Sequence, residues 1–260
     1  MIKSESIRIK EKLKKIRDKR PKPLLDDKIL TDWNSMLISS LSKVSRISNN
    51  FDILDLAIEC NSFLKKNMID NYDLLHCYRD GIASIDGMLD DYSFYSKSLI
   101  DLYETTLDPD YLLDSFRVCE KMISYFWDND DGLFFSSKKG IDDLIVRQKN
   151  LLDGASPCGN STALYSIAKL SNYFFDDNLN RISNTLSSKL GELAKKFPIN
   201  LGMFLANQFL LYKKQTQIVI TSRDEKLDLS NEMVNYAAVS YTHLRAHETL
   251  RYLVCRLLLE

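Results

Sequence analysis

The sequence has no excess of charge of either sign and no long hydrophobic run. Its 35 Lys and Arg residues stand against 36 Asp and Glu residues, so the formal net charge of the 260-residue chain is −1. This balance lacks the basic excess of a nucleic-acid-binding protein, and no stretch approaches the roughly 18 apolar residues of a transmembrane helix. The opening MIKSESIRIK lacks the apolar centre of a signal peptide. We therefore expect a cytoplasmic globular protein with neither a nucleic-acid nor a membrane partner.

The short motifs of cofactor and metal sites are also missing. Neither the GxGxxG nor the GxxxxGK pattern occurs, so no nucleotide cofactor is predicted. The cysteines form no CxxC pair, and an intracellular chain should keep them reduced. We therefore expect no metal and no cofactor.

The last segment, Val239 to Glu260, resembles the translation of a sequencing adapter. Its VSYTHLRAHET matches a transposase-based adapter, and its LVCRLLLE matches the flow-cell primer that follows. The alternative is an ordinary amphipathic helix. We predict that this segment is non-native, which removes two of the three histidines and leaves His76.

Hydrophobic periodicity predicts a mainly helical chain. The expected helices cover residues 31–48, 51–68, 88–106, 109–126, 160–175 and 177–196, with a seventh from Pro198 to about 213. The basic opening segment, 1–20, is predicted to be a further helix, and QIVIT at 217–221 a strand.

The connections between these helices alternate in length. Three helix pairs are joined by a few residues each, which predicts antiparallel hairpins. The longer connections, 69–87 and 127–159, contain the strand-like runs LLHCYRD, GLFFSS and LIVRQ. Because each hairpin returns the chain to the end where it began, both long connections and the starts of the first, third and fifth of these helices should share one end. We call this end the rim.

Four motifs along about residues 5–235 resemble a known family. They are RDKRPKPLLDDKILTDWNSMLI, HCYRDG with GMLDDYSFYSKSLIDLYE, YFWDNDDGLFF, and LIVRQKNLLDGASPCGNS. In order and spacing they resemble the C-terminal part of the thioredoxin-domain-containing family that includes a spermatogenesis-associated protein and bacterial relatives. Ser35 and Cys158 depart from that family, which tends to have Gly and Ser there, and the family's thioredoxin-like domain is not in this sequence.

The resemblance implies an (α/α)6 toroid of the six-hairpin glycosidase-like type, mainly α with small β-hairpins in the long loops. The predicted hairpins make part of such a ring, so we expect a fragment with exposed apolar helix faces and poor solubility or association. The expected segments are a basic helix and linker (1–30), a helical-hairpin toroid fragment (31–215), the start of a truncated unit (216–238) and the non-native tail (239–260).

Carboxylates and aromatic residues gather at the predicted rim. Glycoside hydrolysis needs one protonated and one ionised carboxylate, with aromatic surfaces to hold the sugar ring. An Asp at a helix start usually caps free N–H groups, but in the doublets DDK and LDDY one member suffices for capping. The catalytic candidates are therefore Asp91 and Asp27. The expected binding residues are Trp33, Asn34, Arg79, Asp90, Tyr92, Arg147, Asp153 and Asn160.

These residues favour a carbohydrate-handling, hydrolase-like domain that binds a saccharide or a small polar ligand. Epimerisation, known for related toroids, typically needs two histidines, and His76 alone remains. The alternative is a non-catalytic binding or scaffold domain beside a redox domain. A hydrolase predicts an accessible carboxylate pair roughly 5 to 9.5 Å apart. Carboxylates that all cap helices or pair with Arg would favour the alternative.

Overall fold

The computed structural model describes residues 2–140, 146–212, 216–221, 243–249 and 252–259. Within these ranges the helices are α1 (Ile2–Arg17), α2 (Thr31–Ser48), α3 (Phe51–Asn67), α4 (Leu89–Thr106), α5 (Pro109–Phe126), α6 (Gly159–Phe174), α7 (Asp177–Ala194), the 3-10 helix η1 (Pro198–Asn200) and α8 (Gly202–Tyr212). The predicted helices are confirmed, each with bounds within a few residues of those expected, apart from the last, whose first residues form η1.

Three helical hairpins, α2–α3, α4–α5 and α6–α7, share one turn design. The first helix of each ends at a residue with positive φ, namely Asn49, Leu107 and Phe175. The second helix of each begins at a residue whose side chain accepts a backbone N–H from the first turn of that helix. These capping residues are Asn50, Asp108 and Asp176. Such caps satisfy N–H groups that have no partner within the helix. The local sequence therefore reverses the chain sharply at the end opposite the rim.

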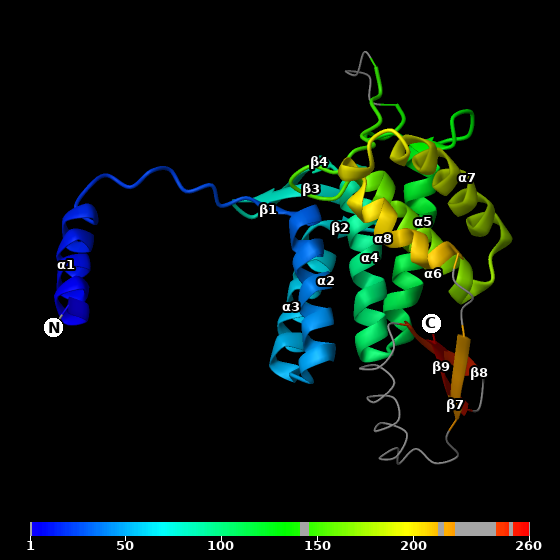
Figure 1. Ribbon diagram of the computed structural model, residues 1–260, viewed down its shortest axis with the longest axis horizontal. Coiled ribbons are helices and arrows are strands. Elements are labelled where there is room, and N and C mark those ends of the chain that lie inside the picture. The colour runs from blue at the N-terminus through cyan, green and yellow to red at the C-terminus, as the bar shows by residue number, and fades with distance from the viewer. Residues whose placement is uncertain (1, 141–145, 213–215, 222–242, 250–251, 260) are drawn as a thin grey trace.

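The first helices of the hairpins form an inner layer with α8. Helix α2 packs on α4, α4 on α6 and α6 on α8, while α3, α5 and α7 lie outside them (Figure 1). Helix α2 buries the small side chains of Ser35, Ser39, Ser42 and Ser45, and Ser39 donates to Asp101 on α4. Helix α4 is buried along most of its length because neighbours cover it on three sides.

Short strands cover the rim. The central strand β3 (Asp73–Arg79) pairs antiparallel with β1 (Ile29–Leu30), β2 (Ile69–Asp70) and β4 (Ile82–Asp86). A second hairpin joins β5 (Trp127–Asp128) to β6 (Leu133–Phe134). The strand predictions for LLHCYRD and GLFFSS are confirmed. The prediction for LIVRQ is wrong in its described part, since Val146 to Gln148 form no strand and the carbonyl of Gln148 accepts a single bond from Ser136.

Strands β7 (Thr216–Thr221), β8 (His243–Thr249) and β9 (Tyr252–Leu259) form a separate sheet in the order β7-β9-β8. The strand predicted at QIVIT is therefore confirmed as β7. Strands β8 and β9 fall in the segment interpreted as non-native, and that interpretation stays a prediction.

Helix α1 stands apart from the hairpins at the end of an extended segment (Figure 1). The side chains from Glu5 to Lys28 are exposed, including Leu24, which is 92% exposed. Apolar side chains are also exposed on the hairpins, as the sequence predicted, and Trp33 on α2 is one of them. None of the described helices combines the length and apolar character needed to cross a membrane.

Candidate functional site

Four titratable residues meet at the rim and are called the rim cluster: Asp32, His76, Asp90 and Asp91. Asp32 lies in the first turn of α2, His76 in β3, and the two other carboxyls in the first turn of α4. The start of α6 joins them, because a Cβ on Gly159 would collide with the carboxyl of Asp90. The predicted meeting of the three helix starts is confirmed.

Asp91 is the buried anchor of the rim cluster. Its side chain is 1% exposed and accepts backbone N–H bonds from Met88 (2.8 Å) and Asp32 (3.1 Å). The Nδ1 of His76 lies 3.0 Å from both carboxylate oxygens of Asp91. Because an ionised carboxylate can only accept hydrogen bonds, Nδ1 carries the proton and is the donor. That hydrogen bond raises the pKa of His76, while partial burial opposes the rise. Asp91 thus caps α4 and ties it to α2 and β3.

Asp90 differs from Asp91 in its exposure and in the pKa of its carboxyl. Its side chain is partly exposed. Burial, together with the negative charges of Asp91 and Asp32, raises the pKa of Asp90 from 3.8 to about 6, although the N–H of Gly159 opposes the rise. Burial and the charge of Asp91 also raise the pKa of Asp32. The rim cluster therefore contains a partly exposed carboxyl that holds its proton up to about pH 6.

Ligand atoms of Asp32, His76 and Asp91 all lie within 4.8 Å of one another, a spacing that could hold a metal ion. However, both oxygens of Asp91 already accept backbone N–H bonds, and the Nδ1 of His76 donates to them. An ion would have to displace these bonds, so hydrogen bonding accounts for the arrangement. The expected absence of a metal stays a prediction.

Three of the predicted binding residues fix the loops at the rim. Asn160, fully buried, forms hydrogen bonds with backbone groups on the β5–β6 hairpin and the following loop. Arg147 donates to two backbone carbonyls and stacks on a phenylalanine ring, with its guanidinium 4.0 Å from the ring centroid. Asp153 accepts N–H bonds at the starts of α6 and α8. In this structure these side chains hold backbone segments in place.

The remaining predicted residues divide between surface and core. Asp27 pairs with Arg79 at 2.8 Å, and the two side chains are 48% and 43% exposed. Asn34 donates to a backbone carbonyl one turn earlier, and Trp33 is 65% exposed. Tyr92 corrects the expectation of a ligand contact: its side chain is fully buried beneath β3, where its hydroxyl accepts a backbone N–H.

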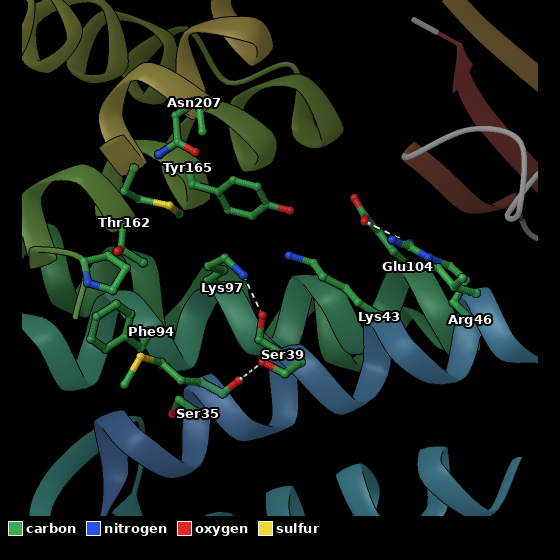
Figure 2. A pocket seen from close by; sticks show the side chains of 16 residues that line it. Ser35, Ser39, Lys43, Arg46, Phe94, Lys97, Glu104, Thr162, Tyr165 and Asn207 are labelled. Atoms are coloured by element: carbon green, nitrogen blue, oxygen red, sulfur yellow. Dashed lines mark hydrogen bonds and ion pairs between the residues drawn. The ribbon is translucent and has the colours of Figure 1, made fainter. Parts of the chain in front are cut away.

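A cavity of about 720 Å³ lies on the inner faces of α2, α4, α6 and α8, and we call it the inner cavity. Figure 2 shows Lys43, Lys97 and Tyr165 pointing into it from three helices. Its lining is Ser35, Met36, Ser39, Ser40, Lys43, Arg46, Ile47, Phe94, Lys97, Glu104, Pro157, Thr162, Tyr165, Met203, Ala206 and Asn207. This volume is within the range typical of small-molecule sites.

Two buried carboxylates organise charge along the inner cavity. Asp101 forms ion pairs with the ammonium groups of Lys97, at 2.7 Å, and of Lys43, at 3.3 Å. Burial opposes ionisation of Asp101, but the two ammonium groups outweigh it and lower its pKa. Glu104 receives Lys169 at 2.6 Å and Arg46 at 3.1 Å. These pairs link α2, α4 and α6 through their polar side chains.

The rim cluster lies about one helical turn beyond one end of the inner cavity. Residues three or four apart share a helix face. Asp32 therefore lies on the same face of α2 as Ser35, and Asp90 on the same face of α4 as Phe94, and both Ser35 and Phe94 line the cavity. The end of the cavity lined by Ser35 and Phe94 is therefore the end nearest the rim cluster.

Sequence reasoning missed the inner cavity. A signal was present in α4 beyond its acidic first turn, where Lys97, Asp101 and Glu104 recur at helical spacing among aliphatic, aromatic, Ser and Thr residues. Charged residues are rarely buried unless they are paired, so such a stripe inside a buried helix indicates partners on neighbouring helices.

The fold is mainly α and is similar to that of six-hairpin glycosidase-like α/α toroids, which are built from helical hairpins. Among solved structures it is similar to an α-mannanase of glycoside hydrolase family 76 from Bacteroides thetaiotaomicron, with a TM-score of 0.58, 15% identity, and 84% of this chain and 59% of that one covered. A sugar epimerase from a ruminal bacterium has a TM-score of 0.54 and 13% identity, over 64% of this chain and 45% of that one. At these identities the likeness shows the fold.

Two sequence relatives are more similar in residue identity. Spermatogenesis-associated protein 20 of Homo sapiens is 30% identical over 171 residues, which are 62% of this chain and 22% of that protein. An uncharacterised protein of Caenorhabditis elegans is 32% identical over 169 residues, 62% of this chain and 23% of that protein. The chain thus spans under a quarter of the length of these relatives. No family model matches it.

Proposed function

We propose that this chain is a carbohydrate-handling domain with hydrolase-like chemistry, in which Asp90 donates the proton. The observation that carries the proposal is a partly exposed carboxyl with a pKa of about 6, one helical turn from the end of a 720 Å³ cavity. A general acid must hold its proton near the working pH and release it to the leaving group. Asp32 supplies the second carboxylate of the pair.

Supporting arguments come from the fold and from the lining of the inner cavity. The solved structures that share the fold include an α-mannanase and a sugar epimerase, whose names denote enzymes of carbohydrates. Hydroxyl, amide and aromatic side chains line the cavity, including Thr162, Tyr165 and Asn207. Such groups suit the hydroxyls and the apolar faces of a sugar ring.

A second candidate is a non-catalytic saccharide-binding domain, which in the resembling family would accompany a thioredoxin-like redox domain. Its support is the state of the two carboxylates first chosen from the sequence. Asp91 is saturated by hydrogen bonds, and Asp27 forms an ion pair with Arg79. Because both carboxylates have structural roles, neither supports a catalytic function of the domain.

A saccharide screen separates the two candidates. The 260-residue chain is incubated with a panel of di- and oligosaccharides, and released reducing ends and bound sugar are both measured. Hydrolase-like function predicts turnover that falls at least a hundredfold in Asp90→Asn while binding persists. Asp26→Asn, which alters an exposed carboxylate paired with Lys28, is the matched control and should keep full activity. Bound sugar without turnover favours the second candidate. If the chain shows no binding and no turnover, both candidates are refuted.

A further inference from the structure

The charges along the inner cavity do not balance. Among the side chains that the structure describes, Lys43, Arg46, Lys97 and Lys169 share just two carboxylates. Both carboxylates are fully buried, with side chains 0% and 1% exposed, so water gives them little screening. The network therefore holds an excess of two positive charges when all its members are ionised.

One of these two positive charges lies at Asp101, on the wall of the cavity formed by α2 and α4. Lys97 is 13% exposed and Lys43 is 39% exposed, and both ammonium groups reach the same oxygen of Asp101. Burial and the neighbouring charge of Lys43 lower the pKa of Lys97, against the attraction of Asp101. Two ammonium groups on one carboxylate repel each other, so a further negative group beside them would be favourable.

Lys43 is the group most open to such a ligand. Its ammonium points into the inner cavity (Figure 2) and lies 5.8 Å from the ring centroid of Tyr165. Lys97 lies 5.1 Å from the same ring centroid. The aromatic ring and the two cations thus form one corner of the cavity, with Ser39 donating to Asp101 behind them.

We propose that the inner cavity binds an anionic saccharide, whose carboxylate or phosphate group contacts Lys43 and Lys97. The proposal rests on the carbohydrate-handling function above and specifies its ligand class. The sugar ring lies against Tyr165, while the charged group offsets the positive excess of α2 and α4. Cationic side chains at a concave polar wall recognise both carboxylates and phosphates, so the two groups share one chemistry.

Equilibrium titration of the 260-residue chain tests this ligand class. The probes are digalacturonate as the carboxylate, mannose 6-phosphate as the phosphate, their neutral parents digalactose and mannose, and inorganic phosphate. We expect at least one anionic sugar to bind at least tenfold more tightly than its neutral parent, and the better of the two identifies the group. Equal affinity for charged and neutral sugars overturns the anionic class and leaves the carbohydrate function intact.

Two other results have different consequences. If no saccharide binds, the carbohydrate function itself fails together with this inference. If inorganic phosphate binds as tightly as the sugar phosphate and digalacturonate does not bind, the cavity is a simple anion site, and the saccharide part is overturned.

Variants of Lys43 locate the contact. Lys43→Gln should weaken the anionic sugar at least fivefold and leave a neutral sugar unchanged, whereas Lys43→Arg should retain most of the affinity. Lys65→Gln is the matched control. The Lys65 side chain is 58% exposed and forms an ion pair with Asp114 between the outer helices α3 and α5. Unchanged binding in Lys43→Gln overturns the assigned contact. Should that variant fail to fold, Lys43→Arg and the sugar comparison on the unaltered protein still decide the outcome.

Discussion

Replacing Asp90 by Asn should stabilise the protein, and by an amount that depends on pH. The folded structure disfavours the charged form of this carboxyl, because burial and the charge of Asp91 raise its pKa from 3.8 to about 6. The folded state therefore holds its proton to higher pH than the unfolded state does. Stability is lost as the pH rises from the unfolded value through the folded one. Asn is neutral throughout, and its side-chain oxygen can still accept the N–H of Gly159.

The size of the effect follows from the two pKa values. They differ by roughly two pH units, and each unit is worth about 1.4 kcal/mol. At about pH 7.5, where both states are ionised, the charged carboxyl costs the folded protein about 3 kcal/mol. At about pH 4.5 the folded state is still protonated and the unfolded state mostly is not, which leaves a cost of about 1 kcal/mol. Asp90→Asn should remove these costs.

Urea denaturation at the two pH values measures the difference. We expect the gain in unfolding free energy of Asp90→Asn to be about 2 kcal/mol larger at the higher pH. Asp26→Asn, in the exposed segment between α1 and β1, should show the same small change at both pH values. A gain that does not vary with pH, or a loss at pH 7.5, would refute the desolvated Asp90 and with it the proton donor of the proposed function.

Three further changes test the packing of the site by denaturation. Gly159→Ala drives a methyl group into the carboxyl of Asp90 and should cost about 1–3 kcal/mol, whereas Gly154→Ala, with open space around it, should be nearly neutral; equal effects contradict the close approach. Asp91→Ala strands three donors and should lower stability by about 3–5 kcal/mol, so a loss below about 1 kcal/mol argues against a buried anchor. Glu104→Gln leaves two cations without their charge partner and should cost about 3 kcal/mol; a neutral outcome contradicts that pairing.

Most of the fold could be predicted because local signals set the helix ends. Asp108 and Pro109 determine the start of α5 without any distant contact, and the short links predict hairpins. The meeting of three helix starts at the rim then follows from chain reversal alone. The strand predicted for LIVRQ is not formed in its described part, Val146 to Gln148, because a strand-like sequence pattern does not reveal whether a partner strand lies beside it.

The candidate site could be predicted in part. The doublet argument anticipated that one member of LDDY would cap the helix and the other would not. Which member caps depends on the residue at which α4 begins. The structure assigns the cap to Asp91 and the open position to Asp90, because the helix begins at Leu89. The inner cavity depends on ion pairs between helices, such as that of Lys169 with Glu104. These residues are far apart in the sequence, so the sequence alone does not predict that they pair.

The turns opposite the rim have a consequence for how this architecture can vary. Each hairpin leaves and re-enters at the rim, and its far end is fixed by a left-handed residue followed by a capping side chain. A hairpin can therefore be duplicated or exchanged as a module, since the path of the rest of the chain stays unchanged. The rim loops can lengthen and diversify in the meantime, while the opposite turns tolerate little change in length. New specificities should accordingly arise by loop insertion at one pole of the molecule.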